Sequence, residues 1–323
     1  MIDNTKPTIL LSRCIEGEKC RYDGTMAKNK FIEKLKPYVN IITVCPESDI
    51  GLPTPRETLR LIKDNEDIKL VFSKSGEEKT KEMIEFTEKF LREIEKVNIH
   101  GVIFKSKSPS CGVKDVKIYT GTGKASAIIK NASGIFSEKC INKFNCIPIE
   151  DDGRLTNYNI REKFLTWIFA NYNFQKVEEK KSVNELIKFQ SKYKYLLMAC
   201  SPYKQKLLGK IVGNTNNTNL EESLKEYKME LANTLKITPR HMRNVNMLLH
   251  LFGYFSKELS KEEKAFFLDN LEKYQNKKAP FSVPLTIIKS WAIRFNNEYL
   301  LNQSIFESFP DELIEVTDSG KGI

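Results

Sequence analysis

Four of the seven cysteines in this chain lie in polar loops rather than inside apolar segments. Cys14 and Cys20 occur in SRCIEGEKCRYDGT, Cys45 in VCPESDIGLPTPRE, and Cys111 in KSKSPSCGVKD. A free cysteine is often a small buried hydrophobic residue. In loops rich in Pro, Gly, Ser and charged residues, the need to fill an apolar core does not explain a cysteine. These four thiols are therefore candidates for chemistry.

Several thiolates without a histidine suit a soft-ligand metal site. A single catalytic cysteine needs a base, and His100, the only histidine in the first half of the sequence, is expected at a strand start on the opposite edge. Thiolate ligands select zinc or iron-sulfur clusters. Zinc ribbons usually pair cysteines two to four residues apart, whereas five residues separate Cys14 from Cys20 and the other gaps are long. The spacing favours a cluster and leaves zinc open.

The same loops carry groups that could move protons. Glu47 lies two residues after Cys45, and Ser108 and Ser110 precede Cys111. A carboxylate beside a metal can serve as general base for water. The alternatives are that Glu47 caps a helix and that the serines form turn hydrogen bonds. Their shared location with the thiols favours a catalytic role.

Short apolar segments predict the strands that must position these loops. They lie at 9–12, 40–44 and 100–105, with amphipathic helical patterns between them. Strands that alternate with helices are typical of an α/β domain with a small parallel, Rossmann-like sheet. Loops at the carboxyl ends of such strands converge on one edge, where ligands bind. The cysteine loops are therefore expected to share one pocket.

The character of the chain changes after EDDGRL at 150–155. We predict an α/β domain over 1–160, a linker or helix over 161–184, and an all-α domain over 185–323, where helical periods dominate. Cys140, Cys146 and Cys200 fall in segments where packing is the expected role.

Composition and charge indicate the class of protein. The net charge is +10, but the Lys-rich stretches also contain Glu or Asp, as solvated helix faces do, so nucleic acid is possible as a partner but not favoured. The odd cysteine count favours reduced thiols over disulfides. The apolar run near the start is too short for a signal peptide, and no stretch approaches the ~18–20 apolar residues of a membrane span. We expect a cytoplasmic protein without a membrane partner.

The first 160 residues resemble the thiouracil desulfidase (TudS) family. The resemblance is carried by CIEGEKCRYDG, VCPESDIGLPTPRE and KSKSPSCGV, followed by GIFSEKC and EDDGRLTNYNIREKF. It implies a [4Fe-4S] cluster held by three cysteines only, which here are Cys14, Cys45 and Cys111. The fourth iron is then open and acts as a Lewis acid on the sulfur of a thiolated pyrimidine such as 2-thiouracil.

The same resemblance implies roles for the polar residues of the site. Glu47 is the candidate base that activates the attacking water. Ser108, with Ser110 second, is the candidate proton relay or sulfur-side donor. Sulfide leaves without net redox change. Cys20 is either a fourth ligand, which would close the cluster and leave an electron-transfer or structural role, or a nearby thiol that shapes the pocket. Arg13 stands where the family usually has a small residue, and its charge could offset that of the cluster.

The second half resembles the YbgA-like helical domain. The resemblance is carried by KFQSKYKYLLMACS, LLGKIVGN, NVNMLLHLFGYFSKELS and VPLTIIKSW, and it implies no activity. Two other functions stay open at this point. One is a cluster-bearing sensor or adaptor whose helical domain binds a partner such as nucleic acid. The other is a zinc-dependent hydrolase.

Overall fold

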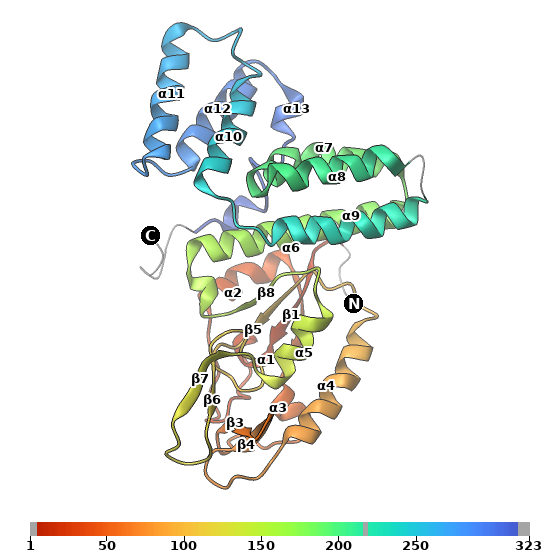
Figure 1. The fold of residues 1–323 in the computed structure, drawn as a ribbon, viewed down its shortest axis with the longest axis vertical. Coiled ribbons are helices and arrows are strands. Elements are labelled where there is room, and N and C mark those ends of the chain that lie inside the picture. The colour runs from red at the N-terminus through yellow and green to blue at the C-terminus, as the bar shows by residue number, and fades with distance from the viewer. Residues whose placement is uncertain (1–4, 216–218, 316–323) are drawn as a thin grey trace. The chain divides into compact units, whose positions relative to one another are not determined.

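The computed structural model describes residues 5–215 and 219–315. The chain divides into two compact units, Met1–Tyr172 with Pro310–Ile323, and Asn173–Phe309. The division falls inside helix α6 (Tyr158–Lys180). This helix covers most of the segment 161–184, which was expected to be a linker or helix (Figure 1).

A four-stranded parallel sheet forms the centre of the first unit, in the order β2-β1-β5-β8. Its strands are β1 (Thr8–Ser12), β2 (Asn40–Val44), β5 (Gly101–Phe104) and β8 (Ile149–Asp151). Every residue of β1 and β5 is buried, as apolar strands covered on both faces should be. The three strands predicted from apolar runs, and the α/β fold class, are confirmed.

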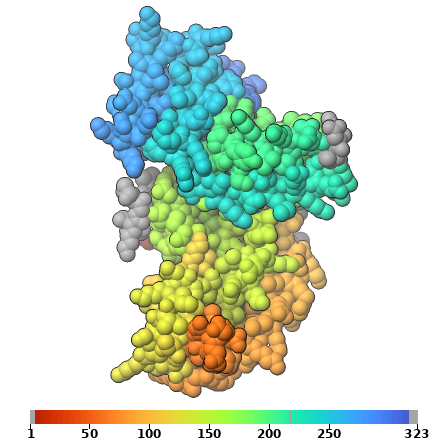
Figure 2. Space-filling model, viewed as in Figure 1, coloured from red at the N-terminus to blue at the C-terminus, as the bar shows by residue number. Residues whose placement is uncertain are grey.

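A second four-stranded sheet was not predicted. Its order is β4-β3-β6-β7, formed by β3 (Leu59–Asp64), β4 (Asp67–Phe72), β6 (Val116–Tyr119) and β7 (Ala127–Ala132). Strand β3 pairs parallel with β6, and the other two pairings are antiparallel. The pattern of KASAIIKNASGIFSEKCINKF predicts a helix, but β7 occupies the first part of this segment and only α5 in its second part is helical. The β6–β7 hairpin lies on the surface, yellow in Figure 2.

Five helices accompany these sheets: α1 (Arg13–Glu16), α2 (Lys30–Leu35), α3 (Pro46–Asp49), α4 (Thr80–Ile94) and α5 (Ile135–Lys143). Short 3₁₀ helices span Lys36–Tyr38, Arg154–Thr156 and Asp311–Leu313. Helices α4 and α5 pack through Phe90 and Phe136, and Phe136 also meets Phe104 of β5 at 5.5 Å between ring centroids. This aromatic contact fixes α5 against the sheet.

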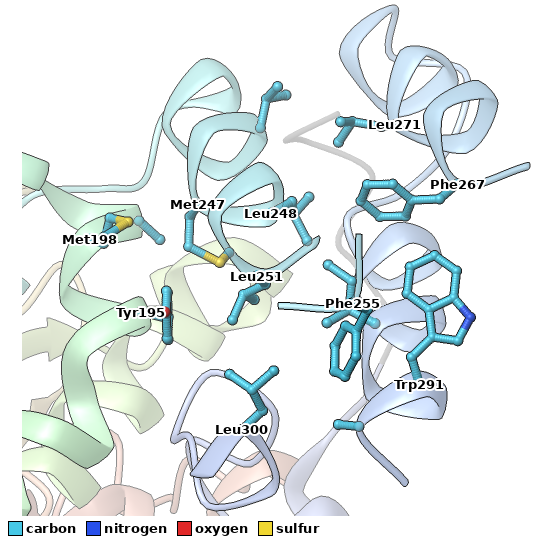
Figure 3. Packing of buried hydrophobic residues seen from close by; sticks show 14 of the residues in the cluster. Tyr195, Met198, Met247, Leu248, Leu251, Phe255, Phe267, Leu271, Trp291 and Leu300 are labelled. Atoms are coloured by element: carbon cyan, nitrogen blue, oxygen red, sulfur yellow. The ribbon is translucent and has the colours of Figure 1, made fainter. Parts of the chain in front are cut away.

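All the regular secondary structure in the described part of the second unit is helical, which confirms the predicted all-α character. Its helices are α7 (Val183–Cys200), α8 (Pro202–Asn214), α9 (Leu220–Leu235), α10 (His241–Phe252), α11 (Lys261–Gln275), α12 (Ser282–Arg294) and α13 (Glu298–Leu301). Phe255, Phe267 and Trp291 pack together in its core (Figure 3). None of the helices in the described part of the chain has the length and apolar character needed to cross a bilayer.

Candidate functional site

Three cysteine-bearing loops follow three neighbouring strands of the parallel sheet. Because β1 lies between β2 and β5 in parallel register, their carboxyl ends share one edge. Cys14 is the second residue of α1, Cys45 precedes the first residue of α3, and Cys111 lies in the loop after β5. The three side chains are no more than 9% exposed. The structure thus brings the predicted loops to one edge.

Cys20 joins this group of thiols. Its thiol interacts with those of Cys14 and Cys45, and the interaction with Cys14 is the largest cause that raises the pKa of Cys20 to about 11. The interaction with Cys20, followed by burial, raises the pKa of Cys45. Burial raises the pKa of Cys111 well above its ordinary value. A metal ligand must be a thiolate, so these buried thiols need a nearby cation to ionise.

The spacing of the donors bears on what they could hold. Among the described residues, no three His, Cys, Asp or Glu side chains converge closely enough to surround one metal ion. With zinc-sulfur bonds of ~2.3 Å, a single ion would require its thiolates within about 4 Å of one another. A cluster of several irons takes each thiolate on a different iron and therefore accepts wider spacing. Donors spread over three strand ends are compatible with the cluster.

Glu47 lies at the meeting point of two loops. Its Oε1 accepts hydrogen bonds from Ser110 Oγ at 2.9 Å and Ser108 Oγ at 3.4 Å. Its Oε2 accepts from Arg56 Nη2 at 2.6 Å and Nε at 3.0 Å. The Arg56 and Glu47 side chains are only 3% and 14% exposed. The three predicted polar residues are therefore together, with the carboxylate oriented by a buried arginine.

Arg56 also holds the loop that contains Cys20. Its Nη2 donates to the Cys20 carbonyl at 3.1 Å, and its backbone N–H donates to the Tyr22 carbonyl at 2.8 Å. Thr54 and Pro53 accept further bonds from Nη1. A planar guanidinium can serve several acceptors at once, so Arg56 joins the loops after β1 and β2.

Ser108 has a defined hydrogen-bond direction. Its Oγ accepts the backbone N–H groups of Ser110 at 3.3 Å and Cys111 at 3.1 Å. A hydroxyl has two acceptor positions and one proton. With both acceptor positions in use, the Ser108 proton is left for the Glu47 carboxylate.

Two aspartates anchor the ends of the loop after β5. Asp151 Oδ1 accepts the Val113 N–H at 2.8 Å. Asp152 accepts from the Ser106 N–H at 2.8 Å and from Lys105 Nζ at 2.7 Å. In the sequence, EDDGRL marks a boundary and carries part of the family resemblance, and no role was assigned to either aspartate. Two acidic residues at the end of the neighbouring strand β8 were the signal that could have revealed it.

The start of helix α5 holds the middle of the same loop. The Gly134 N–H donates to the Gly112 carbonyl at 2.8 Å, and the Phe136 and Ser137 N–H groups both donate to the Ser110 carbonyl at 3.1 Å. A Cβ on Gly134 would lie 2.4 Å from the Ser110 carbonyl oxygen. Glycine is required there because the two backbones approach so closely.

His100 and Cys146 lie away from the four thiols, and Cys200 belongs to the second unit. Cys140, in contrast, packs in the same hydrophobic cluster as Cys111. His100 accepts the Thr8 N–H through Nδ1 at 2.9 Å, at the start of the strands and thus at the opposite edge, as expected. Cys140 and Cys200 are buried, whereas Cys146 is half-buried. A cavity of about 410 Å³ lies beside Lys107 and Pro109, but its lining includes neither the four thiols nor Glu47.

Comparisons with known proteins cover both halves of the chain. Residues 9–152 match the family model described as 2-thiouracil desulfurase, and residues 194–310 match a protein family of unknown function, DUF1722. The uncharacterized protein YbbK of Bacillus subtilis is 34% identical over 147 residues, which is 42% of this chain and 97% of YbbK. The uncharacterized protein YbgA of Escherichia coli is 24% identical over 155 residues, which is 47% of this chain and 91% of YbgA.

A solved structure described as a [4Fe-4S]-dependent thiouracil desulfidase, TudS, is 26% identical. It covers 46% of this chain and 93% of its own, with a TM-score of 0.37. The family assignment rests on the sequence matches, because one family model spans all three cysteine loops and nearly the whole of YbbK is covered. The chain belongs to the 2-thiouracil desulfurase family through its first half, and its second half is a DUF1722 domain.

Proposed function

We propose that the first unit removes sulfur from a thiolated pyrimidine of the 2-thiouracil type and replaces it with oxygen from water. One observation carries the proposal: a carboxylate and two serine hydroxyls are hydrogen-bonded to one another beside a set of buried thiols. The family match over residues 9–152 supports the class of substrate.

Cys14, Cys45 and Cys111 are the proposed ligands of a [4Fe-4S] cluster. Each comes from the end of a different strand, and all three are soft donors of the kind that iron-sulfur clusters require. When bound, the cluster would supply an iron without a protein ligand, which accepts the thiocarbonyl sulfur as a Lewis acid.

Glu47 is the proposed general base. Arg56 occupies Oε2, so Oε1 is the oxygen that faces the serines and can take a proton from water. The water oxygen forms the new C–O bond, the C–S bond breaks, and the sulfur leaves as sulfide with its bonding electrons. Ser108 donates to Glu47 at rest. To complete the transfer, its hydroxyl would turn to the departing sulfur, give the sulfur its own proton and take the proton that Glu47 removed from water. The step is a hydrolysis, so no oxidant or reductant is consumed.

Cys20 supports a second candidate function. Its thiol interacts with those of Cys14 and Cys45, so a fourth ligand could come from this loop. A cluster with four protein ligands has no iron open to substrate and would suit a sensor or adaptor. Cys20→Ala separates the two functions, because an open cluster keeps its iron in this variant and a closed one does not.

The test uses full-length protein reconstituted without oxygen. Iron, zinc and acid-labile sulfide are measured, and the conversion of 2-thiouracil to uracil is followed together with sulfide release. We expect about four irons and four sulfides per chain, a loss of cluster in Cys111→Ala, and a cluster retained in Ser110→Ala with slower turnover. Sulfide release that survives in Cys111→Ala contradicts the proposal, and zinc in place of iron favours the zinc-dependent hydrolase.

A further inference from the structure

An ion pair joins two of the cysteine loops outside the Glu47 site. Arg13 Nη1 lies 2.9 Å from Asp49 Oδ1, and Arg13 Nη2 donates to Asp49 Oδ2 at 3.1 Å. The two side chains are 23% and 24% exposed. Two parallel bonds between a guanidinium and a carboxylate fix both the distance and the orientation of the partners.

Each member of this pair is tied to a proposed cluster ligand. Arg13 directly precedes Cys14, whose carbonyl accepts the Ala27 N–H at 2.8 Å. Asp49 Oδ2 accepts the Cys45 N–H at 3.2 Å, and the Asp49 N–H donates to the Cys45 carbonyl at 2.9 Å. The ion pair therefore connects the backbone at Cys14 with the backbone at Cys45, beyond the point where the pairing of β1 with β2 ends at Ser12 and Val44.

We propose that Arg13 and Asp49 form a positioning clamp that sets the spacing of the Cys14 and Cys45 thiolates and so slows the loss of iron from the cluster. This inference rests on the proposed function, because it requires both cysteines to be ligands. A thiolate that leaves its iron stays close when its loop is clamped, so it rebinds before the iron escapes. Residues that orient metal ligands typically change metal affinity 10- to 100-fold when they are removed.

The clamp is tested by the rate of iron loss from the reconstituted full-length protein. An excess of an iron(II) chelator is added without oxygen, and the chelate absorbance is followed. We expect Arg13→Gln and Asp49→Asn each to accelerate the loss by about tenfold or more. The double variant should be no faster than the faster single one, because both substitutions break the same pair.

Two further variants separate the clamp from other effects. Arg13→Lys keeps the positive charge but loses the two-bond geometry, so it should also release iron faster while the reduction potential of the cluster stays unchanged. Lys69→Gln removes an ion pair of the second sheet, with Asp64, and should release iron at the wild-type rate. Lys69→Gln thus serves as the matched control for loss of an ion pair elsewhere in the unit.

Different results would overturn the clamp and the proposed function. Wild-type rates in Arg13→Gln and Asp49→Asn, or multiplied effects in the double variant, overturn the clamp and leave the proposed function standing. Faster loss in Arg13→Gln together with a wild-type rate in Arg13→Lys also overturns it, because charge alone would then be the cause. A wild-type chain that takes up no cluster overturns the proposed function itself.

Discussion

Asp151 should make the stability of the first unit depend on pH. Its side chain is fully buried, Oδ1 accepts the Val113 N–H, and Oδ2 has no hydrogen-bond partner among the described residues. Burial, partly opposed by the bond from Val113 and reinforced by neighbouring carboxylates, raises the pKa of Asp151 from 3.8 to about 6. The folded unit therefore holds this proton more tightly than the unfolded chain does.

The sign and the size follow from proton linkage. Between pH 3.8 and about 6 the unfolded chain loses the Asp151 proton before the folded unit does, so the free energy of unfolding falls as pH rises through this window. One pKa unit corresponds to ~1.36 kcal/mol, so the whole effect is about 3 kcal/mol. It is absent below pH 3.8 and complete above pH 6. Asp151→Asn removes the titration while its Oδ1 can still accept the Val113 N–H.

Urea unfolding between pH 4 and pH 7 measures this effect. The two tryptophans lie in different units, so a Trp291→Phe background leaves Trp167 to report on the first unit. Between pH 4 and pH 7 the wild-type chain should lose about 2 kcal/mol relative to Asp151→Asn, because part of the effect has already developed at pH 4. Asp67→Asn, at an exposed carboxylate, is the control and should change nothing. Parallel stability curves for the wild type and Asp151→Asn would refute the reasoning.

Three other predictions concern the Glu47 site. Arg56→Gln should lower the free energy of unfolding of the first unit by about 3–5 kcal/mol, because it leaves the buried Glu47 carboxylate without its cation. Urea unfolding measures this loss, and a loss under about 1 kcal/mol would contradict the prediction. Gly134→Ala should lower kcat by about 100-fold and leave the cluster spectrum unchanged, because the new Cβ displaces the loop that carries Ser110. Gly213→Ala is the control: its Cβ would meet open space, so this variant should have the wild-type kcat. Ser108→Ala should lower kcat by about 100-fold or more if Ser108 relays the proton, and an unchanged kcat would remove Ser108 from the mechanism.

The central sheet could be predicted from the sequence because its strands are buried on both faces. TILLS and GVIF are short, nearly continuous apolar runs between turn residues, and such runs are typical of strands that are buried on both faces. The second sheet could not be predicted in this way. LRLIKD and DIKLVF contain charged and exposed positions, and four of the six residues of β7 are exposed, so their pattern gives no clear period.

The location of the site was predictable, but its internal contacts were not. Topology alone brings the loops after β1, β2 and β5 to one edge, which is why Cys14 and Cys111 could be grouped from sequence. The hydrogen bond between Glu47 and Ser110 joins residues 63 positions apart. It depends on the path of the loop after β5. Hydrogen bonds from the backbone of this loop to α5 and to the Asp151 side chain of β8 set that path, and no pattern of residues in the sequence predicts them.

The path of that loop also sets the resting direction of the Ser108 hydroxyl. The Pro109 and Ser110 carbonyls accept N–H groups of α5, so the same two peptide units turn their N–H groups, at Ser110 and Cys111, toward Ser108 Oγ. Those two bonds use the acceptor capacity of the hydroxyl and leave its proton for Glu47. The resting orientation of the Ser108 hydroxyl, toward Glu47, is therefore set by the backbone. Any substitution that moves α5 away from the loop should weaken catalysis even when every proposed catalytic side chain is still present.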